Sequence, residues 1–284
     1  MHRLLASSLS LSLFLFLYYL YATALSSQAA RASETHYRAL HQGNLYLAIW
    51  YLLDHSDGTV KAKTCNLVGN LCRHSGFFYK TLVTPLTDLS PGLYNHSTGA
   101  RGGGGGGAKG AAGAAGANEP PTILRRLIVR CGDEDRATRK FACFAVGNAA
   151  FHSAVLYPHL AAAVPPLVDA MLDREDEKTR ANAAGALGNL VRNSSELCGA
   201  LLQHGALQRL LDVAMRDPSD APKRIALFSL GTISVYARCR SSLEGLEPPL
   251  DRCLADMETR HAADKQMVDH IQRIRNKMAQ PSIA

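Results

Sequence analysis

The sequence predicts an all-α protein built from stacked helical units. An apolar phrase containing Gly-Asn recurs along the chain, at Gly69-Asn70, Gly147-Asn148 and Gly188-Asn189, and a weaker copy contains Gly231-Thr232. The last three copies follow one another at intervals of about forty residues, a period that is typical of stacked helical repeats. In addition, apolar residues recur with the spacing of an α-helix on both sides of a Gly/Ala-rich insert. Alternation of apolar and polar residues is nowhere long enough to predict a strand.

The predicted helices follow one order: a short helix, a middle helix and a long helix. Before the insert, the apolar spacing predicts helices over 45–53 and 62–71; after it, helices over 122–131, 136–150, 156–163, 167–172, 178–192, 195–203, 206–215 and 223–237. Pro120-Pro121 and Pro165-Pro166 begin helices, because proline fits the first turn, where its missing N–H has no helical partner. The small residues of the recurring phrase would let neighbouring long helices pack closely. Because Gly costs roughly 1 kcal/mol in a helix interior, we expect this packing to offset that cost.

Composition shifts divide the chain into five segments. An apolar leader covers 1–32, helical repeats cover 40–94 and 121–244, and 245–284 forms a capping helix and tail. The remaining segment, 95–120, is rich in Gly and Ala and is expected to be a disordered loop, because ordering Gly loses the most backbone entropy. In the tail, Leu250–Met278 carries apolar residues along one side of a helix, which would cover the end of the stack. A coiled-coil or partner-binding helix is the alternative.

The leader leaves two interpretations open. Leu13–Tyr21 is strongly apolar and is followed by small residues, as in a secretory signal or a signal anchor. Such a signal would lead to a secreted or membrane-anchored protein, in which Asn95 and Asn193 become glycosylation sequons. The other interpretation is a truncated gene model whose first residues are not native, in a cytoplasmic protein. The seven cysteines favour the cytoplasm, because they lack Cys-x-x-Cys spacing and Cys65, Cys143 and Cys198 stand where helices require small buried residues.

Two stretches resemble known proteins. Val164–Asn193 (VPPLVDAMLDREDEKTRANAAGALGNLVRN) closely resembles an armadillo repeat. The resemblance implies a right-handed armadillo/HEAT-like α-solenoid of roughly three to five repeats. Arg139–His152 (RKFACFAVGNAAFH), together with Ala161–Pro165, resembles the carboxyl-terminal armadillo region of the Fused family of serine/threonine kinases. That resemblance implies the regulatory end of a kinase that serves hedgehog signalling in animals and assembly of the ciliary central apparatus more widely.

The sequence carries no catalytic constellation. Phosphoryl transfer by a kinase needs a Val-Ala-x-Lys strand, a His-Arg-Asp loop and an Asp-Phe-Gly motif, and all three are absent. The Gly-rich insert lacks Gly-Lys-Ser/Thr, and the histidines do not cluster, so neither a nucleotide cofactor nor a metal is expected. We therefore expect a non-catalytic scaffold, or alternatively a fragment of a full kinase. The formal charge is +7 without a run of Lys and Arg, so nucleic acid is not an expected partner.

The candidate site residues follow from the repeat. In armadillo proteins that bind extended peptides, an Asn on each long helix lines a groove and pairs with the peptide backbone, which makes Asn70, Asn148 and Asn189 candidates for binding a protein or peptide partner. A carboxamide suits this role because it both donates and accepts. The alternative is that each Asn bonds a neighbouring turn and fixes the stack. A Trp that accompanies this Asn in nuclear-import receptors is replaced by Asn66, Phe144 and Gly185, which does not favour nuclear-localisation signals.

Three arginines follow the recurring glycines. Arg73, Arg192 and Arg238 would give the groove a basic lining for an acidic partner. Alternatively, they provide the favourable positive charge of helix carboxyl ends. The sequence leaves the identity of the partner and the oligomeric state open, and a membrane partner follows only if the leader is a real anchor.

Overall fold

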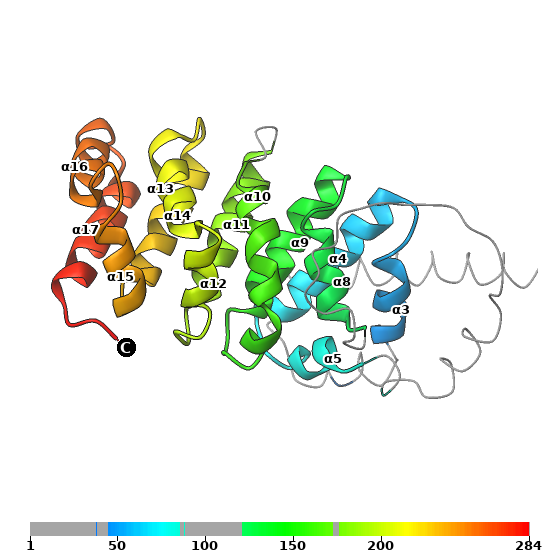
Figure 1. Cartoon of the computed structure of the whole chain (residues 1–284). Helices are drawn as coiled ribbons and strands as arrows, with labels where there is room; N and C mark the ends of the chain where they lie inside the picture. Colours follow the sequence, from blue (N-terminus) through cyan, green and yellow to red (C-terminus); the bar gives the residue numbers. More distant parts are fainter. Residues whose placement is uncertain (1–37, 39–44, 86–87, 89–120, 173–175, 284) are drawn as a thin grey trace, which may run out of the picture.

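The computed structural model describes residues 38, 45–85, 88, 121–172 and 176–283. Within these ranges the chain is helical, with a single isolated β-bridge between Tyr236 and Ile283, so the all-α prediction is confirmed. The helices form a row of units that runs from α3 at one end to α17 at the other (Figure 1). The predicted leader, 1–32, and the predicted disordered loop, 95–120, lie outside the described residues.

The described helices make five units. Unit 1 contains α3 (Leu45–Leu52) and α4 (Gly58–Arg73); unit 2 contains α5 (Tyr79–Val83), α8 (Ile123–Arg130) and α9 (Arg136–Ala149). Unit 3 contains the 3₁₀ turns η2 (Tyr157–His159) and η3 (Ala161–Ala163), then α10 (Val164–Ala170) and α11 (Glu177–Asn189). Unit 4 contains α12 (Cys198–Gln203), α13 (Ala206–Arg216) and α14 (Asp220–Ile233); unit 5 contains α15 (Ala237–Glu244), α16 (Leu250–Arg260) and α17 (Lys265–Ala279). The last helix of each unit, namely α4, α9, α11, α14 or α17, is called its third helix.

Aspartate side chains begin four of the third helices. Asp57 accepts a hydrogen bond from the Thr59 N–H, Asp135 from Thr138 N–H, Asp176 from Lys178 and Thr179 N–H, and Asp264 from Met267 N–H. These carboxylates satisfy N–H groups that have no partner inside the helix, and their charge complements the positive end of the helix dipole. The local sequence therefore explains where most third helices begin.

A continuous apolar core joins the units. Each third helix packs against the third helix of the next unit, α4 on α9, α9 on α11, α11 on α14 and α14 on α17. The residue immediately before the recurring glycine is fully buried in units 1 to 4: Val68, Val146, Leu187 and Leu230. Cys65, Cys143 and Cys198 are buried free thiols, as their helical positions predict.

The insert lies inside a unit rather than between two units. The short helix α5 precedes it and packs against α8, which follows it. The Tyr79 hydroxyl of α5 donates a hydrogen bond to the Asn148 carbonyl of α9, at 2.7 Å. The predicted repeat segments, 40–94 and 121–244, separate α5 from α8, because α5 has only five residues, too few for a periodic apolar pattern.

Three other elements differ from the prediction. The predicted helix over 156–163 is a pair of 3₁₀ turns, because the N–H groups of His159 and Ala163 bond to carbonyls three residues back instead of four. The predicted helix over 223–237 ends at Ile233, and a separate short helix, α15, starts at Ala237. The tail forms two helices, α16 and α17, instead of one, because the Asp264 side chain caps a new helix.

Candidate partner-binding face

The third helices present equivalent side chains on the side that faces away from the core of each unit. On α4 these are Thr59, Lys63, Asn66, Asn70 and Arg73; on and just after α9, Ala137, Phe141, Phe144, Asn148 and Phe151; on and just after α11, Lys178, Asn182, Gly185, Asn189 and Arg192. On and just after α14 they are Ala221, Ile225, Phe228, Thr232 and Val235; on and just after α17, Gln266, His270, Arg273, Lys277 and Gln280. We call this set the third-helix face. All members except Thr232 are at least partly exposed.

The recurring glycines lie where neighbouring third helices are in close contact. A Cβ atom on Gly147 would lie 3.2 Å from the Cα of Ala186, and one on Gly188 would lie 2.5 Å from the Oγ of Ser229. A Cβ atom on Gly69 would lie 2.4 Å from the ring of Phe144. The prediction that the glycines allow close packing is confirmed, because a side chain at these positions would displace the next helix.

Two of the three candidate asparagines connect one third helix to the preceding one. Asn148 Nδ2 donates to the Gly69 carbonyl and Asn189 Nδ2 donates to the Gly147 carbonyl, each at 3.0 Å. Asn70 differs, because its Nδ2 contacts Asn66 Oδ1 on its own helix at 3.4 Å. These contacts fit the alternative role of fixing the stack. A carboxamide has two N–H groups and an acceptor oxygen, so one bond leaves capacity for a partner.

Two tyrosines hold the backbone of the same asparagines, and the sequence did not predict them. The Tyr79 hydroxyl donates to the Asn148 carbonyl, and the Tyr157 hydroxyl donates to the Asn189 carbonyl at 2.6 Å. Burial raises the pKa of both phenols, so they remain protonated donors at neutral pH. The spacing of the two tyrosines equals that from Gly69 to Gly147, which is the signal that could have identified them.

Of the three candidate arginines, two lie on the third-helix face. Arg73 is the last residue of α4 and is exposed. The Arg192 guanidinium lies 4.2 Å from the ring centre of Phe151 in the preceding unit. Arg238 was predicted to follow the third helix of unit 4 directly, but it lies on α15, the first helix of unit 5. The cause is the early end of α14, and Arg238 lies close to Gly199 of α12.

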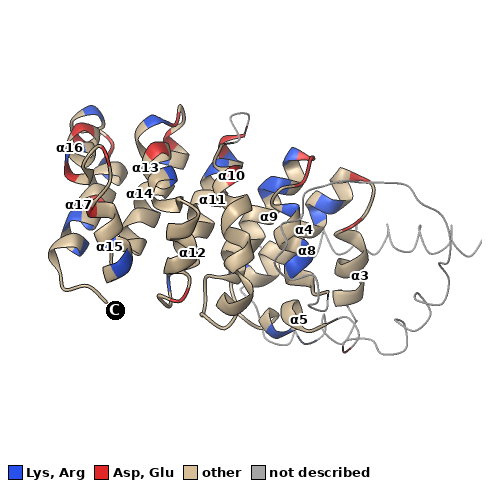
Figure 2. Ribbon diagram, in the orientation of Figure 1, with Lys and Arg blue, Asp and Glu red and all other residues tan. Residues whose placement is uncertain are grey.

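A row of ion pairs runs along a different edge of the stack. In each pair, a cation on one third helix contacts an aspartate of the next unit, in the link that leads to that unit's own third helix. The pairs are Lys61 with Asp133 (2.7 Å), Lys140 with Asp176 (3.6 Å), Arg180 with Asp217 (2.6 Å) and Arg224 with Asp264 (2.6 Å). We call this row the ion-pair ladder. Figure 2 shows acidic residues gathered along this edge, at the links. The sequence did not predict the ladder, because each pair joins residues of different units.

The ladder changes the acidity of its carboxyl groups. Burial on its own would raise the pKa of Asp133, but the hydrogen bonds from Lys61 and the Asp135 N–H, with the charges of Lys61 and Arg130, lower it below its ordinary value. The pKa of Asp264 is lowered, chiefly by the hydrogen bond from Arg224. These carboxylates therefore stay ionised and paired throughout the neutral pH range.

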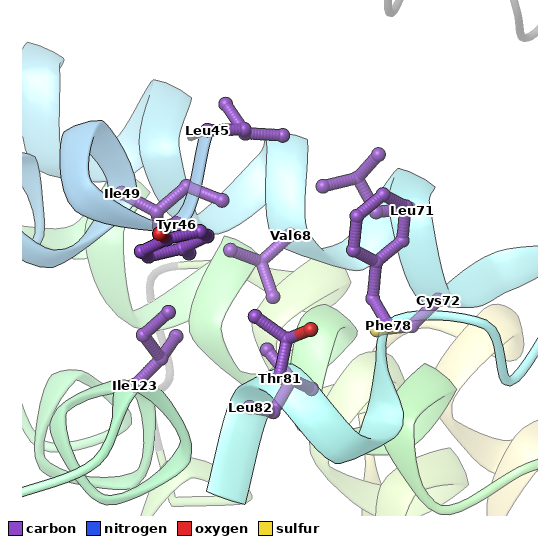
Figure 3. A pocket seen from close by; sticks show the side chains of 10 residues that line it. All are labelled: Leu45, Tyr46, Ile49, Val68, Leu71, Cys72, Phe78, Thr81, Leu82 and Ile123. Atoms are coloured by element: carbon purple, nitrogen blue, oxygen red, sulfur yellow. The ribbon is translucent and has the colours of Figure 1, made fainter. Parts of the chain in front are cut away.

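An apolar pocket lies in the first two units, between α3, α4, α5 and α8 (Figure 3). Its volume is about 10 Å³, close to that of a single water-sized sphere. Its lining side chains are Leu45, Tyr46, Ile49, Val68, Leu71, Cys72, Phe78, Thr81, Leu82 and Ile123. Burial raises the pKa of the Cys72 thiol to about 12, so this thiol is not a nucleophile at neutral pH. The pocket is too small and too apolar for a cofactor.

The part of the chain that the structure describes contains neither a group of potential metal ligands nor a helix that could cross a membrane. Its His, Cys, Asp and Glu side chains do not gather in groups of three that could hold a metal ion. Within the same residues, no helix has both the length and the apolar character needed to cross a bilayer.

Comparison with known proteins agrees with the helical stack. The HEAT-like repeat family matches residues 139–190. A designed armadillo repeat protein, solved in complex with the peptide (KR)4, superposes with a TM-score of 0.64 at 17% identity, covering 90% of this chain and 91% of that chain. Because the identity is low, this likeness shows the fold alone. The protein is an armadillo-type α-solenoid.

Sequence similarity places the repeats within a narrower group. Serine/threonine-protein kinase 36 of Mus musculus is 33% identical over 188 residues, 66% of this chain. Serine/threonine-protein kinase TIO of Arabidopsis thaliana is 33% identical over 234 residues, 78% of this chain. The chain spans 11% of the mouse protein and 15% of the Arabidopsis protein. It is related to the repeat part of Fused-type kinases, as the sequence phrases predicted.

Proposed function

We propose that this chain is a non-catalytic scaffold that binds a protein or peptide partner along its third-helix face. The observation that carries the proposal is the row formed by Asn70, Asn148 and Asn189. Their side chains are partly exposed, and hydrogen bonds to the preceding helix orient two of them. An oriented carboxamide with remaining donor and acceptor capacity suits an extended backbone, whatever its side chains. The peptide complex of the designed armadillo protein supports this use of the fold.

The similarity to Fused-type kinases suggests where such a scaffold acts. We propose that it is the regulatory part of a kinase of this type, in the cytoplasm and in association with cilia, with a role in hedgehog signalling or in assembly of the ciliary central apparatus. The relatives are kinases, but the match covers their repeat regions and the present chain carries no kinase motif. The chain is therefore proposed to bind rather than to transfer phosphate.

The first experiment selects binders from a phage-displayed library of random dodecapeptides on the purified protein. We expect enrichment of peptides that bind the wild type. These peptides should not bind a variant in which Asn70, Asn148 and Asn189 are all replaced by alanine. Because two of these residues also hold neighbouring helices together, a control must remove a similar bond away from the face. Ser229→Ala is that control, since the buried Ser229 hydroxyl donates to the Ala184 carbonyl of the preceding third helix at 2.8 Å.

The outcomes separate binding from stability. The proposal is supported if the triple variant loses binding, Ser229→Ala retains it, and thermal melts show that both variants remain folded. Absence of any enriched peptide, or unchanged binding by the triple variant, contradicts it.

Two alternatives have tests of their own. Transcript reads that run in frame from a kinase domain into the repeats would make the chain a fragment of a full kinase, whose regulatory part it would still be. A secreted or anchored protein would instead appear in the membrane or lumenal fraction of cells that express the tagged full-length chain. Two contacts disfavour this second alternative, because a glycan replaces one of the two hydrogens of Asn193 Nδ2. This atom donates to the Ala150 and Phe151 carbonyls, at 3.3 and 3.1 Å.

A further inference from the structure

We propose that the third-helix face binds an extended acidic peptide that places two apolar side chains on either side of its acidic residues. This inference rests on the proposed function, because it assigns a chemical class to the partner of the same face. It follows from the charge of the face, the position of its aromatic side chains and the distance between them.

The charge of the face is entirely positive. Its charged members are Lys63, Arg73, Lys178, Arg192, Arg273 and Lys277, and none of its members is Asp or Glu. Among the described residues, the last five of these cations form no ion pair with a carboxylate. A surface that carries one sign of charge attracts and orients a partner of the opposite sign.

The aspartates of the ion-pair ladder do not cancel this charge. Asp133, Asp176, Asp217 and Asp264 are paired with cations in the ion-pair ladder, along the edge of the stack. The ladder therefore consists of neutralised pairs, whereas Arg73, Lys178, Arg192, Arg273 and Lys277 have no carboxylate partner in the part of the chain that the structure describes.

Two of the cations are held in place by aromatic rings. Arg192 lies over Phe151 and Arg273 lies over Phe228, with 4.2 and 4.6 Å from the guanidinium carbon to the ring centre. Arg273 also donates to the Phe228 carbonyl at 2.7 Å. Such contacts reduce the side-chain freedom that binding would otherwise remove, so these guanidinium groups are oriented before a carboxylate arrives.

Apolar side chains lie on both sides of the central third helix, α11. Phe141 and Phe144 are partly exposed on α9, and Ile225 and Phe228 are partly exposed on α14. Between them lies Gly185 of α11, and the Ile225 side chain packs over it, with its Cγ2 3.3 Å from the position that a Gly185 Cβ would take. The peptide backbone would cross α11 beside this contact. Lys178 and Arg192 lie near the two ends of α11 and can reach carboxylates on either side of that backbone.

Helix spacing sets the length of the motif. Packed helices lie about 8–10 Å apart, so α9 and α14, with α11 between them, are separated by about 16–20 Å. An extended peptide advances about 3.3 Å per residue, so two apolar side chains that reach α9 and α14 stand about five or six residues apart. The acidic residues belong between them, opposite α11.

The same charges could attract a nucleic acid, but the aromatic positions favour the peptide. A polyanion gains affinity from each phosphate that a Lys or Arg neutralises, so it would use the cations of the whole face and would not need the aromatic side chains. The acidic peptide confines its charge to the stretch opposite α11. Single-stranded DNA therefore serves as one arm of the test.

The test measures anisotropy of a fluorescein-labelled peptide with two Phe residues separated by Glu and Asp, together with a version in which Lys replaces the acidic residues. We expect the acidic peptide to bind and the basic one not to bind. Arg192→Glu should weaken the acidic peptide about tenfold or more, because it places like charges together. Arg252→Glu is the matched control, since Arg252 is exposed on α16, away from the face, and its replacement should leave binding unchanged.

The outcomes distinguish this inference from the proposed function. If the peptide library enriches neutral or basic sequences whose binding needs the asparagine row, the proposed function holds and the acidic partner is wrong. If oligo(dT) binds more tightly than the acidic peptide and loses affinity in Arg192→Glu, the face recognises a polyanion instead and the inference is overturned. Acidic sequences with apolar residues five or six positions apart support it.

Discussion

At the scale of single residues, the recurring glycines set the distance between units. We predict that Gly188→Ala destabilises the protein even though alanine is the better helix former by roughly 1 kcal/mol. The new Cβ would lie 2.5 Å from Ser229 Oγ and 3.0 Å from Ser229 Cα, and a backbone atom cannot move aside without shifting α14. Such overpacking costs about 1–3 kcal/mol. Urea unfolding followed by circular dichroism measures the change.

The matched control for this prediction is Gly132→Ala. A Cβ atom on Gly132 would have one neighbour, the Val129 carbonyl oxygen, at 3.9 Å. We expect stability within about 0.5 kcal/mol of the wild type, as for most surface substitutions. A Gly188→Ala variant at least as stable as the wild type would show that the third helices do not need the close approach.

The buried ion pair between units 3 and 4 leads to a second prediction at this scale. The side chains of Arg180 and Asp217 are only 5% and 2% exposed, and two hydrogen bonds of 2.6 and 2.8 Å join them. Asp217→Ala leaves a buried guanidinium without this carboxylate, which costs about 3–5 kcal/mol of unfolding free energy. The double variant Arg180→Met with Asp217→Leu should lose less than Asp217→Ala alone. Denaturant midpoints of both variants check this, and an equal or larger loss in the double variant would contradict it.

At the scale of elements, the ion-pair ladder links stability to pH. The pKa of Asp133 is lower in the folded protein than its ordinary value of about 4. A carboxyl group whose pKa is lowered by folding stabilises the fold above its unfolded pKa, and this contribution is lost as the pH falls through the folded pKa. We therefore predict that the melting temperature decreases as the pH is lowered below about 4. In Asp133→Asn it should fall less over the same range, and an identical fall in both proteins would exclude a contribution from Asp133.

The elements also show how far the sequence could predict the fold. Long helices were predictable, because a third helix such as α9 has a full apolar period and an aspartate N-cap. Two short first helices, α5 and α15, were not predicted: they have five and eight residues, and their place depends on contacts with other units. The Asn row was predictable from its repetition, but its bonds to glycine carbonyls were not, because they join residues of different units. The misplaced Arg238 has the same origin, since packing ends α14 before the apolar pattern does.

At the scale of the whole molecule, the stack is a chain of neighbours. Each third helix contacts the units before and after it, so we expect disturbance at one end to fade toward the other. We predict that removal of α17 increases hydrogen exchange most in α14, whose surface it covers, then in α11, and least in α4. Ile271 and Ile274 on α17 are fully buried, so the truncation also exposes apolar surface and should reduce solubility. Uniform loss of protection from α4 to α14 would show instead that the described units unfold as one.

The double use of the asparagine row constrains how this surface can change over evolutionary time. Asn148 and Asn189 belong both to the proposed binding surface and to the contacts that hold the helices together, so a substitution there alters affinity and stability at once. Lys178 and Arg192 lie on the same surface, and their side chains donate no hydrogen bond to the backbone of a neighbouring described helix. New partner preferences should therefore arise at the flanking positions, while the asparagines stay the same. Related chains with different partners would then share the row and differ in the residues around it.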